Sequence, residues 1–159
     1  MRVAIVDDDN ELLENLSSLI SNELLAIGDS SKKISKFHSG EELLASFKQG
    51  AYDLIILDIF MGGMLGIDVA RKIREGDNDV RLVFCTTSNE FASESYEVNA
   101  QYYLHKPFTE KSVKAMLDRL GMDSYEFAKH ITLSTGQSII LRNVIYTEYF
   151  GHNVTIHCK

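Results

Sequence analysis

Proline, cysteine and long apolar runs are scarce in this chain of 159 residues. There is no stretch of about 18 apolar residues, which argues against a membrane-spanning helix. The amino terminus also lacks the basic flank and long apolar core of a signal peptide. The two cysteines, Cys85 and Cys158, do not have disulfide or zinc-motif spacing. We therefore expect buried free thiols and a reducing, cytoplasmic location, with no role in a membrane.

Positive charge is also in short supply. The chain has 16 lysines and arginines against 23 acidic residues, and its formal net charge is −7. This excess of acid lies in residues 1–120, whereas residues 121–159 carry three charges of each sign. An acidic surface repels nucleic acid, so the first part is not expected to bind DNA. A chain of this length can bury one good core and little more.

Strand and helix patterns alternate five times along the first 120 residues. Apolar runs at 3–6, 54–57 and 82–85 and alternating residues at 33–38 and 101–105 predict five strands. Helical spacing of apolar residues predicts helices between and after them, around Leu12–Leu24, Ser39–Phe47, Val69–Ile73, Asn89–Val98 and Thr109–Leu120. Five such units imply a doubly wound α/β fold, with a parallel five-stranded sheet between helices.

Strand composition also predicts the order of the sheet. The first, third and fourth strands are apolar throughout, as central strands covered on both faces must be. The second and fifth carry polar residues suited to edges, namely Lys33, Lys36, His38, Gln101 and His105. The flavodoxin-like order 2-1-3-4-5, counted along the chain, meets both conditions. Ligands of such sheets bind at the carboxyl ends of the strands, where Asp7, Asp8 and Asp58 would meet.

Four motifs lie at those strand ends. They are Val6-Asp7-Asp8-Asp9, Leu57-Asp58-Ile59-Phe60-Met61 with Gly66 beyond it, Thr86-Thr87, and Tyr103-Leu104-His105-Lys106-Pro107-Phe108. In this order and spacing, residues 1–121 resemble the receiver domain of two-component response regulators. The resemblance implies a phosphoacceptor that catalyses its own phosphoryl transfer and dephosphorylation, and not a turnover enzyme.

The resemblance also implies roles for the residues that chemistry requires. Asp58 would be the nucleophile that takes a phosphoryl group from a sensor histidine kinase. Lys106 would neutralise one phosphoryl oxygen, and Thr86 would donate a hydrogen bond to another. Pro107, the only proline, matches the family's cis-peptide position.

A magnesium ion would complete the site. The resemblance assigns its direct ligands to Asp8, Asp58 and the backbone carbonyl of Phe60, with Asp7 acting through water. An acid run can also be a solvated turn with a helix cap, and Asp9 or Asn10 fits that interpretation. The family commonly has proline four residues after the phosphorylated aspartate. Here Gly62 stands in its place, so a looser loop is expected.

Thr86 and Tyr103 match the family's switch residues. They would couple phosphorylation to the surface formed by the helix 89–98, the strand 101–105 and the helix 109–120, through which a homodimer could form. The alternatives are a strand-end threonine and a packing tyrosine.

Residues 122–159 have a different pattern. Short strands at 131–133, 139–141, 144–150 and 154–158 predict an antiparallel β module. Residues 139–154 resemble the beginning of a LytTR DNA-binding domain, so we expect a truncated output segment behind a receiver at 1–121. Lys129, Arg142 and Lys159 are its only fixed positive charges. DNA binding is therefore expected only of a full-length output domain, and the strand edges offer a second route to a homodimer.

The sequence thus predicts a response regulator that controls transcription. Two alternatives stay open. An aspartate-nucleophile phosphatase usually needs a second acid two residues after the nucleophile, where this chain has Phe60. A phosphate-independent interaction module would not need the acid pair together with Asp58, Thr86 and Lys106.

Overall fold

Strands and helices alternate through the first 120 residues of the computed structural model, which describes residues 1–29, 32–87, 91–122, 130–133, 138–141, 144–151 and 153–158. The elements of this part are β1 (Arg2–Val6), α1 (Asn10–Ala26), β2 (Lys33–Phe37), α2 (Gly40–Ser46), β3 (Leu54–Asp58), α3 (Gly66–Gly76), β4 (Arg81–Thr86), α4 (Ala92–Glu97), β5 (Tyr102–His105) and α5 (Glu110–Arg119). Some predicted features lie outside the described residues. They are residues 134–137 between two predicted strands, the expected helix start at Asn89, and the charged residues Lys129, Arg142 and Lys159.

The five strands form one parallel sheet in the order β2-β1-β3-β4-β5, which confirms the prediction. β3 is buried along its whole length, and β1 and β4 are buried after their first residue. The edge strands β2 and β5 are partly exposed. Strands that are covered on both faces need apolar residues at every position, which is why composition revealed the order.

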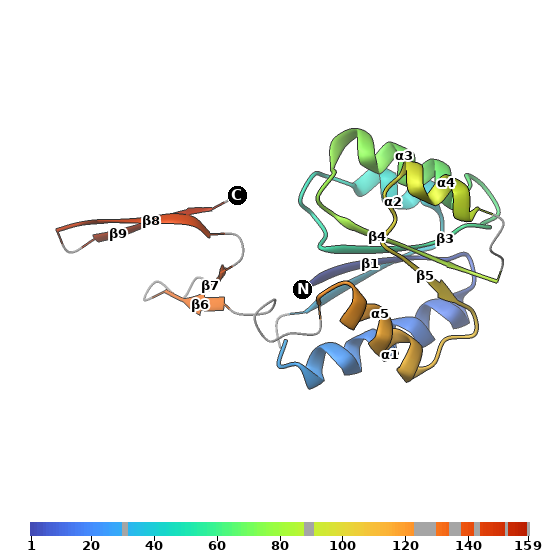
Figure 1. Cartoon of the computed structure of the whole chain (residues 1–159), viewed down its shortest axis with the longest axis horizontal. Helices are drawn as coiled ribbons and strands as arrows, with labels where there is room; N and C mark the ends of the chain where they lie inside the picture. The colour runs from blue at the N-terminus through green and yellow to red at the C-terminus, as the bar shows by residue number, and fades with distance from the viewer. Residues whose placement is uncertain are drawn as a thin grey trace.

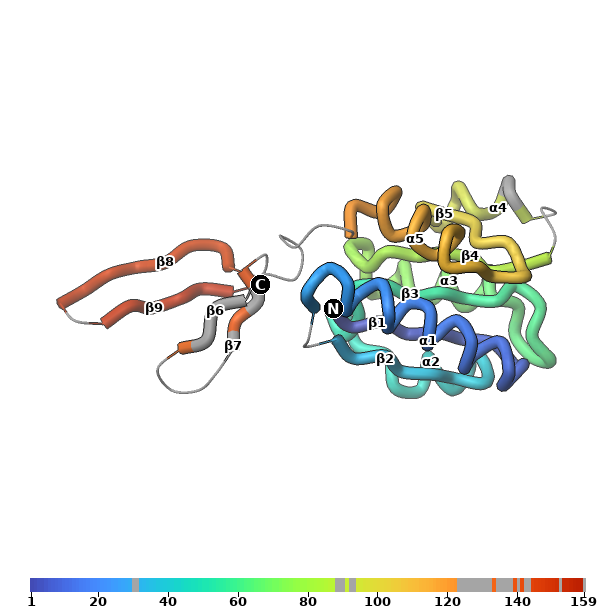
Figure 2. Tube along the Cα trace, turned by 90° about the horizontal axis from the view of Figure 1, so that it is seen from below, coloured from blue at the N-terminus to red at the C-terminus, as the bar shows by residue number. Residues whose placement is uncertain are grey.

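Helices cover both faces of this sheet. Figure 1 shows α1 and α5 on one side and α2, α3 and α4 on the other, and Figure 2 shows α1 and α5 from the outside. α1, α2, α3 and α5 bury apolar residues against the sheet, and those of α1 are Leu13, Leu16, Ile20 and Leu24. The sheet therefore divides the core into two apolar clusters, one beneath each helical layer.

Side-chain caps begin three of the helices. The Asp9 carboxylate accepts hydrogen bonds from two backbone N–H groups of the first turn of α1, which confirms the predicted cap. Ser39 caps α2. Thr109 and Ser112 form a reciprocal capping box at α5. Thr86 ends β4, as expected for the end of the fourth strand, and its backbone pairs with β5.

Two antiparallel pairs follow: β6 (His130–Thr132) with β7 (Ser138–Ile140), and β8 (Val144–Phe150) with β9 (Asn153–Cys158). They confirm the predicted antiparallel segment and do not extend the five-stranded sheet. Tyr146 stacks on His157 across the second pair, with ring centroids 4.2 Å apart. In the part of the chain that the structure describes, no helix has the length and apolar character needed to cross a membrane.

Candidate functional site

Four neighbouring strands each bring one reactive side chain to the carboxyl edge of the sheet. Asp7 directly follows β1, Asp58 ends β3, Cys85 lies in β4 and Lys106 directly follows β5. Val6 pairs with Leu57, and Asp58 pairs with Cys85, so Asp7, Asp58 and Cys85 fall in register on one face. Residues more than fifty positions apart thereby meet at one point, as predicted for the two aspartates.

Lys106 joins the two buried carboxylates. Its Nζ lies 2.7 Å from Asp7 Oδ2 and 2.8 Å from Asp58 Oδ2. Asp7 is 2% exposed and Asp58 is 5% exposed, so neither charge is well solvated. Burial of this kind is costly unless the charges are paired and hydrogen-bonded, and Lys106 supplies both the charge and the bonds.

Burial and pairing have opposite effects on these groups. Burial raises the pKa of Asp58, and the hydrogen bond from Lys106 offsets only part of that rise. Burial alone would lower the pKa of Lys106, but its hydrogen bonds to Asp58 and Asp7 outweigh burial and raise the pKa above its usual value. Lys106 therefore stays a cation and can pair with a further anion that binds at Asp58.

Asp8 points to the loop that follows β3. It is exposed, and its Oδ2 accepts a hydrogen bond of 3.0 Å from the backbone N–H of Gly62. The Glu41 carboxylate accepts a second bond of 3.0 Å, from the backbone N–H of Met64. Two carboxylates thus hold the loop after β3, which was expected to be loose because of Gly62.

Gly66 lies directly against Asp58. A Cβ atom at this position would be 2.0 Å from the Asp58 carbonyl oxygen, so no larger residue fits without movement of the backbone. Glycine lets α3 begin close to the end of β3 and holds the loop near the nucleophile. The match of Gly66 to the family motif therefore has a steric reason.

The remaining predicted residues surround this centre. Thr86 is fully buried at the end of β4, opposite His105 of β5. The Phe60 side chain is 45% exposed and packs edge-on against Phe91, with ring centroids 5.5 Å apart. Tyr103 is partly buried, and its hydroxyl donates a 2.8 Å hydrogen bond to the Phe91 carbonyl oxygen just before α4.

Sequence reasoning missed two neighbours of the site. Cys85 was expected to be an ordinary buried thiol, but its Sγ joins the acid pair; burial raises the pKa of this thiol well above its usual value. Its position immediately before Thr86, on the face opposite that residue, was the available signal. Glu41 was also missed, because nothing in the helix pattern of 39–47 indicated that its side chain reaches the loop after β3. The Lys106–Pro107 peptide bond is cis, as the resemblance implied.

The acidic donors fit a hard divalent cation. Ligand atoms of Asp7, Asp58 and Cys85 all lie within 4.8 Å of one another. Carboxylate oxygens are the ligands that Mg²⁺ prefers, and a thiol is not. Asp8, the residue after Asp7, adds an exposed carboxylate that is bonded to the Gly62 N–H. The carboxylates of this site therefore suit Mg²⁺ as a ligand set.

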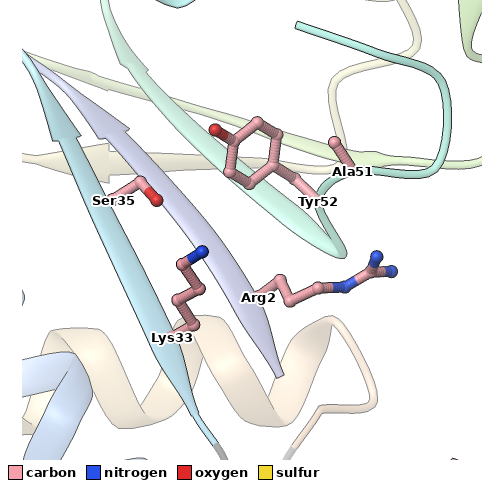
Figure 3. A pocket seen from close by; sticks show the side chains of 5 residues that line it. All are labelled: Arg2, Lys33, Ser35, Ala51 and Tyr52. Carbon is pink, nitrogen blue, oxygen red and sulfur yellow. The ribbon is translucent and has the colours of Figure 1, made fainter. Parts of the chain in front are cut away.

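A separate hollow of about 160 Å³ opens between β1, β2 and the segment before β3. Figure 3 shows its lining by Arg2, Lys33, Ser35, Ala51 and Tyr52. The guanidinium of Arg2 is occupied there by Asp53, at 2.7 Å, and by the Gly50 carbonyl oxygen, at 2.6 Å. Arg2, Lys33 and Ala51 belong to the amino-terminal ends of the strands, so this hollow is distinct from the acidic cluster.

Comparison with known proteins agrees with this geometry. Residues 3–118 match the family described as the response regulator receiver domain. The sensory transduction protein LytR of Staphylococcus epidermidis is 30% identical over 122 residues, which cover 77% of this chain and 46% of that protein. This chain therefore spans about half the length of that relative.

Two further matches extend the comparison. The sensory transduction protein LytT of Bacillus subtilis is 25% identical over 178 aligned positions, covering 98% of this chain and 72% of that protein. The crystal structure of the response regulatory domain of protein mrkE from Klebsiella pneumoniae is 30% identical, with a TM-score of 0.63, and the match covers 76% of this chain and 95% of that one. The chain therefore belongs to the receiver domain family of two-component response regulators, which are signalling proteins and not turnover enzymes.

Proposed function

We propose that Asp58 accepts a phosphoryl group from a phosphohistidine of a sensor kinase in the cytoplasm. A carboxylate oxygen of Asp58 forms the new bond to phosphorus, the bond from phosphorus to the histidine nitrogen breaks, and the imidazole leaves. The observation that carries this proposal is the contact of Asp58 with Lys106, 2.8 Å long, at the carboxyl edge of the sheet.

Charge neutralisation is the main demand of phosphoryl transfer, because the transferred group spreads negative charge over three oxygens. Lys106 already lies between Asp7 and Asp58 and can turn to one phosphoryl oxygen. The hydroxyl of Thr86 is proposed to donate a hydrogen bond to another.

Magnesium, when bound, would supply the remaining positive charge and orient the phosphoryl donor. We propose Asp8, Asp58 and the backbone carbonyl of Phe60 as its direct ligands, with Asp7 acting through water. The exposed carboxylate of Asp8, which follows Asp7 in sequence and contacts the loop after β3 at Gly62, supports this assignment.

We further propose that the chain divides into a receiver at 1–121 and a LytTR-type output segment from 122 onward. Phosphorylation would add roughly −1.5 to −2 charge at Asp58 and alter the surface of α4, β5 and α5 through Thr86 and Tyr103. The altered surface would promote a homodimer, and a full-length output domain would then bind DNA and control transcription. The antiparallel strands β6–β9 and the similarity to LytR and LytT proteins support this part of the proposal.

Intact-mass spectrometry tests the acceptor directly. With Mg²⁺ and acetyl phosphate, the parent chain should gain one phosphoryl group that is lost on heating or in acid. Asp58→Asn should gain none while keeping the parent's circular dichroism spectrum.

Asp68→Asn is the matched control, because Asp68 is an exposed aspartate paired with Arg71. It should be labelled like the parent. Equal labelling of Asp58→Asn and the parent would overturn the assignment.

A further inference from the structure

The thiol of Cys85 is an unusual component of this acidic site. The residue is fully buried, and its Sγ is directed at the carboxylate oxygens of Asp7 and Asp58, within 4.8 Å of each. Among the described residues, no side chain is hydrogen-bonded to this sulfur. Neither phosphoryl transfer nor magnesium binding has a use for a sulfur atom, because Mg²⁺ takes oxygen ligands.

Two carboxylates and one thiol form a donor set of a different class. Thiolate sulfur binds soft and borderline divalent ions, and carboxylates complete many such sites. We propose that Asp7, Asp58 and Cys85 form a cation site for thiophilic divalent ions such as Zn²⁺ or Cd²⁺, overlapping the site for magnesium.

The three ligand atoms need little movement to close around such an ion. Bonds to zinc of about 2.3 Å from sulfur and about 2.1 Å from oxygen in a tetrahedron place ligand atoms about 3.5 Å apart. A separation of at most 4.8 Å therefore requires a closure of about 1 Å, which small side-chain rotations can supply. As the metal–sulfur bond forms, the thiol releases its proton to solvent.

Lys106 must leave its present place for this to happen. Its ammonium now occupies the cation position between Asp7 and Asp58, at 2.7 and 2.8 Å. The side chain is already 12% exposed and has a flexible four-carbon stem, so it can turn outward. An oxygen-preferring ion such as Mg²⁺ gains no sulfur bond to compensate for this displacement, so it would bind through the carboxylates without Cys85.

A thiophilic ion held here would engage the Asp58 carboxylate and displace Lys106. Since the proposed phosphorylation needs both groups, the bound ion would inhibit it; this consequence rests on the proposed function, whereas the binding itself does not. The site would thus make the regulator sensitive to thiophilic metals.

Cadmium titration is the direct test, because cadmium–thiolate bonds absorb in the ultraviolet by charge transfer. All proteins carry Cys158→Ser, since Cys158 is exposed and would bind cadmium itself. The Cys158→Ser protein should bind one Cd²⁺ with a charge-transfer band. Adding Cys85→Val, which suits a buried strand, should abolish the band and weaken binding about tenfold or more.

Further variants separate a built site from chance binding. Cys85→Ser should also lose the band, and Asp58→Asn should weaken cadmium binding. Asp68→Asn, an exposed acid away from the sulfur, should leave the band and the affinity unchanged. Circular dichroism establishes folding for each variant. The absence of a band in folded Cys158→Ser protein, or an equal affinity in Cys85→Val, would overturn the proposed site.

Phosphorylation gives a separate readout. Cadmium should inhibit Mg²⁺-dependent labelling by acetyl phosphate in Cys158→Ser, relative to the cadmium-free rate of the same protein, and inhibit much less in the additional Cys85→Val variant. Labelling without any charge-transfer band would leave the phosphoacceptor proposal standing and remove the metal site. A band without labelling in cadmium-free protein would support the metal site and remove the phosphoacceptor proposal.

Discussion

Lys106 sets the electrostatics of the site by pairing with Asp7 and Asp58 at once. These three charged groups are largely buried, and two of them are negative. The pair of carboxylates is therefore incompletely compensated, and the pKa of Asp58 is raised by its burial. The buried carboxylate of Asp58 therefore lowers the stability of the folded protein, while Lys106 beside it can bind an anion.

Asp58→Asn should therefore stabilise the protein by an amount that grows with pH. Because burial raises the pKa of Asp58 above 3.8, the folded state holds this proton more tightly than the unfolded state. The parent thus loses stability as pH rises above about 4, until the folded carboxyl is ionised. Asparagine does not titrate. In urea unfolding between about pH 4 and pH 7, the difference in free energy of unfolding should widen in the variant's favour.

Asp68→Asn should show no such widening, since Asp68 is an exposed member of an ion pair. A difference for Asp58→Asn that shrinks as pH rises would contradict the electrostatic account.

Asp8 and Asp9 are neighbours that should respond oppositely to alanine. Asp9 caps α1, so Asp9→Ala should cost about 1 kcal/mol of stability and leave Mg²⁺ binding close to that of the parent. Asp8→Ala should weaken Mg²⁺ binding about tenfold or more and cost less stability, because the exposed Asp8 carboxylate bonds only the Gly62 N–H in the structure. Magnesium titration by NMR and urea unfolding of both variants measure the two quantities. Equal losses of Mg²⁺ affinity would show that the acid run is misassigned.

At the scale of elements, α4 is a short helix next to the end of β5. It spans only Ala92–Glu97 and has no side-chain hydrogen bond at its N-cap, Phe91. Tyr103 of β5 holds the start of this helix instead, through its hydroxyl on the Phe91 carbonyl oxygen. Phe60 packs on the same Phe91 ring from the loop after β3. Tyr103 and Phe60 therefore connect β5 and the loop after β3 to Phe91 at the start of α4.

Thr86→Ala should accept phosphate at Asp58 but couple it poorly to self-association. The hydroxyl of Thr86 is the proposed partner of a phosphoryl oxygen, and its shift would make room for Tyr103 to move. Typical coupling energies are about 1–3 kcal/mol, so phosphorylation should strengthen dimerisation much less in the variant. Mass spectrometry and sedimentation on the same samples measure the two steps.

Thr87→Ala removes the neighbouring, exposed hydroxyl and should behave like the parent. If Thr86→Ala is phosphorylated and dimerises like the parent, the coupling does not run through this threonine.

At the scale of the whole molecule, charge separates the two parts of the chain. The receiver carries the entire net charge of −7, and the balanced residues 121–159 have three lysines and arginines. The described strands β8 and β9 expose large apolar side chains, among them Ile145, Tyr149, Phe150 and Val154. Neither part of the sequence has an excess of lysine and arginine over acidic residues.

The 159-residue chain should therefore show no sequence-selective DNA binding. Phosphate contacts supply much of the affinity of DNA-binding proteins, and a net negative chain opposes them. A gel-shift assay at low salt, with specific and scrambled DNA fragments compared side by side, tests this expectation. Tight selective binding by this chain alone would contradict it.

The sequence by itself determined the architecture and the meeting of the two buried aspartates. β1, β3 and β4 are apolar because both of their faces are covered, so composition revealed the strand order. Parallel strands end at one edge, which brought Asp7 and Asp58 together without any knowledge of contacts. The helix cap at Asp9 was also readable, because a cap bonds backbone groups within its own turn.

Only the tertiary structure decided which groups touch within the site. Three features depend on strand register and on side-chain rotamers. Lys106 contacts both aspartates, and Asp8 and Glu41 bond the loop after β3. The Cys85 thiol lies beside the acid pair. Register follows from pairing between distant strands, and rotamers follow from packing against neighbours that a local pattern does not specify. The chemistry of the carboxyl edge was therefore visible in the sequence, whereas its sulfur atom became part of the site only when β3 and β4 paired.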